Sequence, residues 1–235
     1  MEIRMNCLRD HFKQVLFELG AGYYSRKIAT GPEAELRNRF VDWMNLTPAA
    51  QGAHGRDVLD VGCGPGHVTR AFARRGHSVT GVDRCRSLLR IARRSASREA
   101  LSIRFEHSPV EKLPFPDASF DCAFTTGVIY WVEKPLETLR EMVRVLRPGG
   151  MIASLDPHAS MSLGRVQKYS QSRQLPRRDA RKLVTWAMAA GMNRRFEERE
   201  LRALFTRAGI TNLTLERQLS GMVWFSRGIV PHHPR

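Results

Sequence analysis

The chain has 235 residues, a net charge of +15 and 42% hydrophobic residues, enough to bury a core of ordinary size. No run approaches the roughly 20 apolar residues of a membrane span, and the first residues lack a signal-peptide core. We therefore expect a cytoplasmic protein without a membrane partner. The four cysteines form no C-x-x-C pair, so we expect reduced thiols and no metal site.

The first part of the chain predicts helices followed by a regular alternation of strands and helices. Two amphipathic helices are expected over 6–20 and 33–46, with a polar loop over 47–55. Further strands are predicted over 57–61, 78–82, 102–106, 120–125 and 151–155, and helices over 66–75, 87–98 and 134–146. This alternation predicts an α/β fold: a doubly wound, Rossmann-like, mostly parallel sheet with helices on both faces.

After the fifth strand the alternation stops, and residues 157–178 are polar and poor in strand formers. The remaining predicted elements are two helices and two strands, over 178–191, 197–208, 210–217 and 221–229. The two strands meet at a turn and predict an antiparallel pair at the sheet edge. We interpret 1–235 as one domain: an N-terminal helical extension (1–55), a cofactor-binding core (56–155), a substrate lid (156–195), and a C-terminal helix with edge strands (196–235).

The most informative stretch joins the first strand to the next helix through glycines at alternate positions: Gly62, Gly64 and Gly66. Glycine permits positive φ and lets a ligand approach the backbone closely. Free amides at this turn would face the polar tail of a ligand. A tight turn without a ligand is the alternative interpretation.

Two carboxylates narrow the choice of ligand. Asp83 ends the next strand, where it can accept hydrogen bonds from both hydroxyls of a ribose. Asp60 ends the first strand, where it would repel a pyrophosphate and attract an ammonium group. The third glycine also comes one residue earlier than in the dinucleotide fingerprint, and His67 takes its place. The pattern therefore favours a nucleoside cofactor with a zwitterionic tail.

With these residues in view, the sequence resembles the class I S-adenosylmethionine-dependent methyltransferases of the small-molecule type, near the ubiquinone/menaquinone biosynthesis C-methyltransferase group. The resemblance covers residues 56–155 well. It rests on four motifs in order, at 59–66, 82–83, 113–121 and 146–150. It implies S-adenosylmethionine as the cofactor, with S-adenosylhomocysteine as product.

The resemblance also implies cofactor-binding residues. Asp60 and the glycine loop, with Cys63, would surround the methionine part of the cofactor. Asp83 would hold the ribose, and Arg84 would lie beside the adenine. The chain departs from the family at Pro109, where an acidic residue usually contacts the adenine amino group. Two neighbours of Pro109 are expected to substitute for that contact, Val110 through its backbone amide and Glu111 through its side chain.

Candidate acceptor-side residues lie at the carboxyl ends of the fourth and fifth strands. Thr126, Tyr130 and Trp131 follow the fourth strand, where an aromatic face could stabilise a sulfonium. Asp156 and His158 follow the fifth strand, and His158 could act as a base near neutral pH. We single out Tyr130, Asp156 and His158 as catalytic candidates, and Thr126 as a cofactor contact. Tyr23 and its neighbour Tyr24 could form part of a lid over the cofactor.

The predicted function is methyl transfer to a small-molecule acceptor, aromatic or acidic, by direct in-line displacement. An RNA methyltransferase and a non-enzymatic cofactor-binding protein are the alternatives. The positive charge favours nucleic acid, but it is spread along the chain and no RNA-binding appendage is recognisable. Four arginines, at 86, 90, 93 and 94, are expected on the solvated face of one helix. A monomer or a homodimer is compatible with the sequence.

Overall fold

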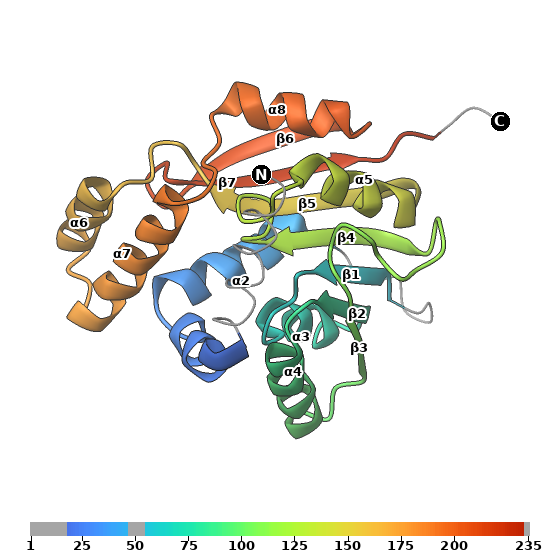
Figure 1. Cartoon of the computed structure of the whole chain (residues 1–235), viewed down its shortest axis with the longest axis horizontal. Coiled ribbons are helices and arrows are strands. Elements are labelled where there is room, and N and C mark those ends of the chain that lie inside the picture. The colour runs from blue at the N-terminus through green and yellow to red at the C-terminus, as the bar shows by residue number, and fades with distance from the viewer. Residues whose placement is uncertain (1–17, 47–54, 233–235) are drawn as a thin grey trace, which may run out of the picture.

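The computed structural model describes residues 18–46 and 55–232, and its centre is a seven-stranded sheet (Figure 1). The predicted helix over 6–20 and the loop over 47–55 therefore fall partly outside the described residues. Residues 18–28 are helical. The strands are β1 (Asp57–Val61), β2 (Ser78–Asp83), β3 (Ile103–His107), β4 (Phe120–Thr126), β5 (Leu146–Pro157), β6 (Thr211–Gln218) and β7 (Val223–Ile229).

The strand order is β3-β2-β1-β4-β5-β7-β6. The first five strands pair in parallel, and β7 lies antiparallel between β5 and β6. The order reverses direction at β1, so β1 and β4 flank the point where open α/β sheets bind ligands. The predicted doubly wound sheet with an antiparallel C-terminal edge is confirmed.

The helices are α2 (Pro32–Met44), α3 (His67–Ala73), α4 (Arg86–Arg98), α5 (Pro135–Val145), α6 (Leu163–Ser172), α7 (Arg177–Gly191) and α8 (Glu198–Arg207). Because β1 to β2 and β4 to β5 advance in opposite directions, right-handed crossovers put α3 and α5 on opposite faces of the sheet. Helix α2 packs against α3, and α8 packs against α5. Figure 1 shows α6 and α7 together, beyond the arrowheads of β4 and β5.

Two elements differ from the expectations. Helix α6 lies within the stretch that predicts no regular structure, because it buries only Val166 and Ser170 and so carries a weak apolar period. Ser162 caps it by accepting a hydrogen bond from the Arg165 amide. Strand β5 begins five residues earlier than predicted, at Leu146, since its Pro-Gly-Gly segment continues the strand next to an irregularity in the β4 pairing.

Four phenylalanines fix helix α2 against the sheet. Phe40 of α2 contacts Phe124 of β4 and Phe225 of β7, with ring centroids 6.3 and 5.1 Å apart. Phe72 of α3 lies 4.9 Å from Phe124. All four side chains are fully buried, and each contributes about 2–3 kcal/mol through the removal of apolar surface from water. This cluster holds the first turn of α2 at the carboxyl ends of the strands.

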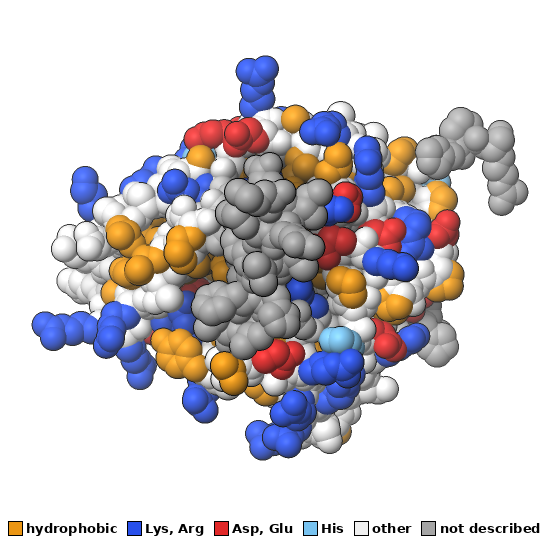
Figure 2. Space-filling model, viewed as in Figure 1, with side chains coloured by type: hydrophobic (Ala, Val, Ile, Leu, Met, Phe, Trp, Pro, Cys, Tyr) orange, Lys and Arg blue, Asp and Glu red, His pale blue; other side chains and the backbone are white. Residues whose placement is uncertain are grey.

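The charged surface does not gather into one stripe. Figure 2 shows lysine and arginine side chains around the margin of one face, interspersed with acidic and apolar groups. Helix α4 presents the arginines at 86, 90, 93 and 94 to solvent, as predicted, and it buries Leu88 and Ala92. Among the described helices, none is both long and apolar enough to cross a membrane.

Candidate active site

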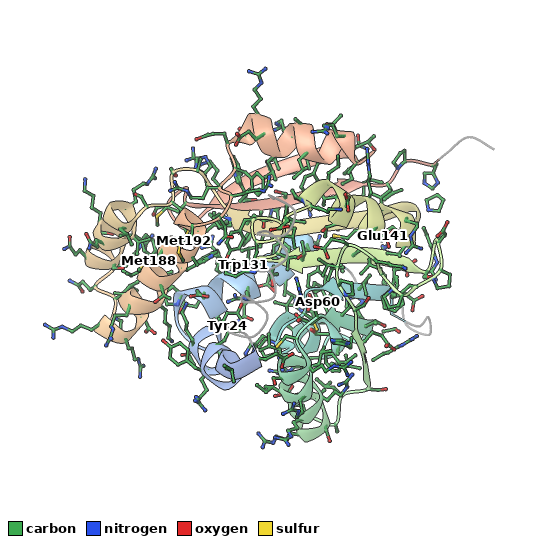
Figure 3. The ribbon with its side chains drawn as sticks, in the orientation of Figure 1. Tyr24, Asp60, Trp131, Glu141, Met188 and Met192 are labelled. Atoms are coloured by element: carbon green, nitrogen blue, oxygen red, sulfur yellow. The ribbon has the colours of Figure 1, made fainter. Side chains whose placement is uncertain are left out.

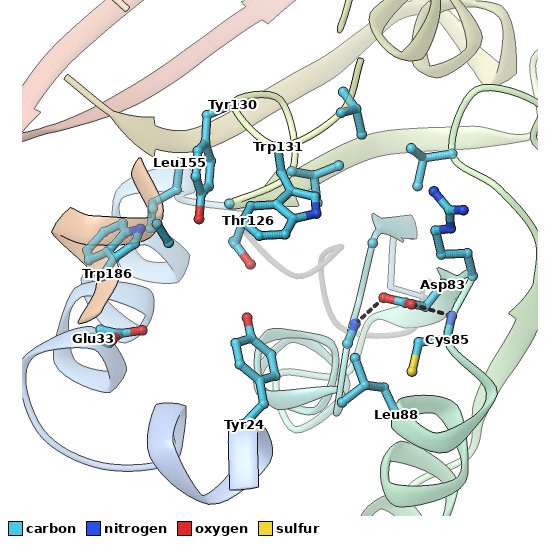
Figure 4. Close-up of a pocket in the computed structure, with 18 of the residues that line it drawn as sticks. Tyr24, Glu33, Asp83, Cys85, Leu88, Thr126, Tyr130, Trp131, Leu155 and Trp186 are labelled. Atoms are coloured by element: carbon cyan, nitrogen blue, oxygen red, sulfur yellow. Dashed lines mark hydrogen bonds between the residues drawn. The ribbon is translucent and has the colours of Figure 1, made fainter. Parts of the chain in front are cut away.

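A cavity of about 330 Å³ lies at the carboxyl ends of β1, β2 and β4. The helix of residues 18–28, the first turns of α2 and the middle of α7 close its other side. Figure 4 shows Asp83, Cys85 and Leu88 at one end, and Glu33, Trp186 and Tyr130 at the other. Tyr24 and Thr126 lie between the two ends. The cavity therefore has two compartments that meet beside the β1 and β4 strand ends.

The glycine loop has the backbone conformation that the sequence predicts. Gly62, Gly64 and Gly66 have φ angles of 74°, 53° and 74°, a region that favours glycine. A Cβ on Gly62 would occupy the space of Val128 Cγ2. A Cβ on Gly64 would meet only Tyr24 Cε1, 4.0 Å away. The loop thus leaves a narrow open cradle between Gly64 and Tyr24, and a ligand in it would contact the Gly64 backbone and the Tyr24 ring.

The expectation of free amides in this loop is wrong. The amides of Gly62 and Cys63 both donate to the carbonyl of Val82, at 2.8 and 2.9 Å. The Gly64 amide donates to Asp83 Oδ2 at 2.8 Å, and the Gly66 amide donates to the carbonyl of Cys63. The turn satisfies its own donors because a buried amide without a partner is unfavourable. Of the three glycines, Gly64 is the one whose missing Cβ leaves open space, because a Cβ at Gly62 or Gly66 would meet Val128 or Ala92.

Asp83 lies where the sequence predicts it, with its carboxylate in the cavity wall. It is 8% exposed and accepts hydrogen bonds from the amides of Gly64 and Cys85, both at 2.8 Å. Burial raises its pKa, which these two hydrogen bonds oppose. Each carboxylate oxygen keeps a second lone pair, so the group can still accept from vicinal hydroxyls. Figure 4 shows both hydrogen bonds.

Three further predicted cofactor residues, Arg84, Val110 and Glu111, line the same end of the cavity. Cys85 and Leu88 also line this end, although no sequence motif predicts either residue there. Tyr23 is 67% exposed at the rim, whereas its neighbour Tyr24 points into the cavity. Burial raises the pKa of the Tyr24 phenol, so its hydroxyl stays protonated at neutral pH.

Asp60, Cys63 and Gly66 do not line the cavity. The Asp60 carboxylate accepts a hydrogen bond of 2.6 Å from the Thr69 hydroxyl, and its other oxygen has no partner in the described structure. Burial raises the pKa of Asp60 to about 7. Cys63 packs behind the loop against Leu89 and Phe105, and Gly66 forms the N-cap of α3. These residues support the loop from behind.

Of the catalytic candidates, the structure brings only Tyr130 to the cavity. Asp156 is fully buried, and its Oδ1 accepts a hydrogen bond of 3.1 Å from the Tyr130 amide. Burial raises the pKa of Asp156 to about 6. Tyr130 itself lines the cavity, as does Trp186, and burial raises the pKa of the Tyr130 phenol. Asp156 therefore does not line the cavity itself, but its hydrogen bond holds the loop that carries Tyr130.

His158 lies away from the cavity. Its Nδ1 accepts a hydrogen bond of 2.8 Å from the Ser160 amide, and its ring lies 5.0 Å from the Trp224 ring. Burial lowers its pKa. The side chain turns back onto β7 because the Pro157–His158 segment pairs with Phe196 and Met222 rather than turning over the strand ends. A position directly after the fifth strand does not by itself predict this direction of the side chain.

The predicted lid contributes through α7 and not through α6. Thr185, Trp186 and Ala189 of α7 line the cavity, while Met188 and Met192 are 54% and 76% exposed. Figure 3 shows both methionines on the α7 side of the molecule, away from Asp60. One face of α7 thus closes the cavity, and its other face points to solvent.

The sequence analysis did not identify three charged residues that line the α2 end of the cavity: Lys27, Glu33 and Arg37. Glu33 lies in the first turn of α2, where an acidic residue is explained by the helix dipole alone. A sharper signal was available, because Glu33 and Arg37 share one helix face with the core residues Leu36 and Phe40. Charged residues that share a helix face with buried apolar residues point toward the interior of the protein. No three metal-ligating side chains cluster within the part of the chain that the structure describes.

Comparison with known proteins agrees with this geometry. Residues 59–154 match the family model described as a methyltransferase domain. The ubiquinone/menaquinone biosynthesis C-methyltransferase of Pseudomonas paraeruginosa is 31% identical over 204 residues, which cover 80% of this chain and 78% of that protein. Demethylmenaquinone methyltransferase of Deinococcus radiodurans is 37% identical over 160 residues, 62% of this chain and 65% of that protein.

Solved structures share the fold. Phosphoethanolamine N-methyltransferase 2 of Haemonchus contortus, solved with S-adenosyl-L-methionine, superposes with a TM-score of 0.69 at 13% identity, over 92% of this chain and 57% of that chain. A possible histamine N-methyltransferase of Thermotoga maritima superposes with a TM-score of 0.60 at 21% identity, over 91% of this chain and 97% of that chain.

The cofactor of these enzymes fits the residues of this cavity. S-Adenosylmethionine has a ribose for a carboxylate such as Asp83, and a chain that can enter the cradle between Gly64 and Tyr24. The cavity, the fold and the relatives therefore agree, and the chain belongs to the class I S-adenosylmethionine-dependent methyltransferases, near the ubiquinone/menaquinone biosynthesis C-methyltransferase group.

Proposed function

We propose that this enzyme methylates a small-molecule acceptor, aromatic or acidic, by direct in-line displacement. The observation that carries the proposal is the division of the cavity. One end has the residues expected around a nucleoside, and the other end has space lined by Tyr130, Trp186 and Glu33. An acceptor in the second compartment would face the cofactor beside Thr126 and Tyr24.

At the cofactor end, we assign Asp83 to the ribose hydroxyls. Arg84, Val110 and Glu111 line the position expected for the adenine, which compensates for Pro109. Gly62 and Gly64 allow close approach of the methionine part, as the cradle beside Tyr24 indicates. Asp60 then supports the loop from behind, through the hydrogen bond that it accepts from Thr69 rather than through direct contact with the cofactor.

Bound S-adenosylmethionine supplies a methyl group already activated by a sulfonium, so the protein needs few catalytic groups. The chain's own residues align the acceptor and exclude water. Tyr130 and Trp186, which are 7% and 9% exposed, both line the acceptor compartment and close it from solvent. We assign Tyr130 to acceptor contact and Asp156 to positioning of the Tyr130 loop. His158 has no part in this proposal.

A transfer assay tests the proposal. The enzyme is incubated with S-adenosylmethionine labelled in its methyl group, together with a small-molecule extract or with total RNA. Label in the small-molecule fraction, lost in a Tyr130→Ala variant, supports the proposal. Label in RNA that nuclease treatment releases would favour the RNA methyltransferase instead. Absence of transfer to any fraction, with binding of S-adenosylhomocysteine intact, would favour a binding protein.

A further inference from the structure

The segment of residues 113–121 carries one of the four sequence motifs but does not line the cavity. It begins two residues after Glu111, which lines the adenine end of the cavity together with Val110. Pro114 and Pro116 carry no amide hydrogen, and the first residues of the segment belong to no strand. The backbone carbonyls there therefore need donors other than a strand partner.

One arginine of helix α5 supplies those donors. Arg144 Nη1 donates to the carbonyl of Phe115 at 2.8 Å, and Arg144 Nη2 donates to the carbonyl of Leu113 at 3.0 Å. The same guanidinium donates to the two oxygens of Glu141 at 2.7 and 2.8 Å, and to Asp117 at 2.8 Å. All five N–H groups of Arg144 thus have an acceptor, and the planar guanidinium holds the segment in one position.

Glu141 holds the same segment through its amide. Glu141 Oε2 accepts a hydrogen bond of 2.8 Å from the amide of Leu113. The hydrogen bonds from Arg144 lower the pKa of Glu141, so its carboxylate is charged at neutral pH. Neither residue lines the cavity, and Figure 3 shows Glu141 well apart from Tyr24. The pair therefore fixes both the amide and the carbonyl of Leu113 from outside the cavity.

The turn of residues 108–112 is held at both ends. At its start, the Ser108 amide donates to the carbonyl of Asp83 at 3.2 Å. The Ser108 hydroxyl donates to the carbonyl of Lys112 at 2.9 Å, which closes the turn on itself. At its end, the chain enters Leu113, which α5 holds. The position of this turn therefore depends on Asp83 at one end and on α5 at the other.

Position matters in this turn because its proline, at the place of the usual acidic residue, offers neither a side-chain acceptor nor an amide hydrogen. Contact with the adenine is left to the neighbouring groups, which a small shift of the turn would misplace. We propose that Glu141 and Arg144 are positioning residues that set this turn for contact with the adenine. They act through Leu113 and touch no part of the cofactor. The inference rests on the proposed assignment of Val110 and Glu111 to the adenine.

Selectivity between two bases tests the inference without turnover. Isothermal titration calorimetry measures the affinities of S-adenosylhomocysteine and of S-inosylhomocysteine, in which a carbonyl oxygen replaces the adenine amino group. The unaltered protein is expected to bind the adenine ligand at least about tenfold more tightly, because the replacement reverses the donors and acceptors at that edge of the base. In Arg144→Gln the ratio is expected to fall to about threefold or less, since the turn is released. A purely structural loss would weaken both ligands equally and leave the ratio unchanged.

A second arginine of the same helix provides the control. Arg140 is exposed, and Arg140→Gln is expected to retain the ratio of the unaltered protein. An unchanged ratio in Arg144→Gln overturns the inference. If Arg144→Gln does not fold, Glu141→Gln decides by the same ratio, because it keeps an acceptor for the Leu113 amide but removes the charged partner of Arg144.

The unaltered protein separates this inference from the assignments on which it rests. Equal binding of the two ligands overturns the assignment of the turn to the adenine, and the inference with it. Absence of S-adenosylhomocysteine binding overturns the cofactor site as a whole. The ratio does not depend on the acceptor, so failure of the proposed transfer to small molecules leaves it unaltered.

Discussion

The carboxylate of Asp83 accepts a hydrogen bond of 2.8 Å from the amide of Gly64. This contact ties the end of β2 to the glycine loop after β1, the two segments that the sequence assigned to one cofactor. The other carboxylate oxygen of Asp83 accepts a hydrogen bond from the amide of Cys85, the N-cap of α4. The residue expected to hold the ribose is therefore also the residue that shapes the loop.

Replacement of Asp83 by Asn is expected to weaken S-adenosylhomocysteine binding at least tenfold. The neutral amide is a weaker acceptor for the ribose, and its NH₂ group cannot accept from one of the two backbone amides, so about 1.5–3 kcal/mol is lost. Isothermal titration calorimetry measures this directly. Glu106→Gln on the neighbouring strand β3, outside the cavity, is the control and binds as the unaltered protein does. Equal affinity of Asp83→Asn would remove Asp83 from the site.

Replacement of Gly62 by Ala tests the packing of the loop. The added Cβ meets Val128 and forces a side chain into a φ of 74°, so the free energy of unfolding is expected to fall by about 2–4 kcal/mol. Urea denaturation provides the measurement. A second substitution, Val128→Ala, is expected to recover part of the loss by removing the steric conflict while the backbone strain remains.

Gly191→Ala serves as the control for the loop substitution. A Cβ at Gly191 contacts nothing within 4 Å, and alanine is the better helix former, so stability is expected to rise by about 0.5–1 kcal/mol. A Gly62→Ala protein as stable as Gly191→Ala would show that the loop tolerates a side chain.

Much of this site was predictable from sequence, and the exceptions have physical causes. The alternation of strands, the glycines and Asp83 are local signals, and each lies where the pattern indicates. Lys27 and Glu33 precede Asp83 by 56 and 50 residues, and Trp186 follows Thr126 by 60 residues, so only the tertiary fold brings them together. His158 lies away from the cavity because the direction of its ring depends on the pairing of β5 with β7, which no local sequence pattern indicates.

Asp60 gives a pH dependence. Its folded pKa is about 7, whereas an unfolded Asp titrates near 3.8, so the folded state binds the extra proton between these values. The free energy of unfolding is therefore expected to fall as pH rises from about 4 to 7, by roughly 1–4 kcal/mol. Asp156, with a pKa of about 6, contributes in the same direction at the lower end of this range.

The Asp60→Asn variant isolates this effect. Asn retains an oxygen that accepts from the Thr69 hydroxyl, but it does not titrate. Its free energy of unfolding, measured without ligand by urea denaturation, is expected to vary much less between pH 6 and 7 than that of the unaltered protein. An identical pH profile for the two proteins would show that Asp60 is charged in the folded state.

Replacement of Trp186 by Phe tests the acceptor compartment. Phenylalanine keeps much of the packing but removes the indole N–H and part of the ring that lines the cavity. The KM for the acceptor is expected to rise about threefold to tenfold, while S-adenosylhomocysteine affinity changes by less than about twofold. Met188→Ala, on the exposed face of the same helix, leaves both unchanged. Loss of cofactor affinity with unchanged KM would reverse the assignment of the two ends.

A thermal-shift titration with S-adenosylhomocysteine, with NADH as the comparison ligand, tests the central claim most directly. A ligand that binds only the folded state stabilises it by about 2.7 kcal/mol at a hundredfold excess over its dissociation constant. We predict a concentration-dependent rise in melting temperature with S-adenosylhomocysteine, none with NADH, and a much smaller rise in Asp83→Asn. A rise with NADH alone, or no rise with either ligand, would contradict the account of this cavity as a methyltransferase site.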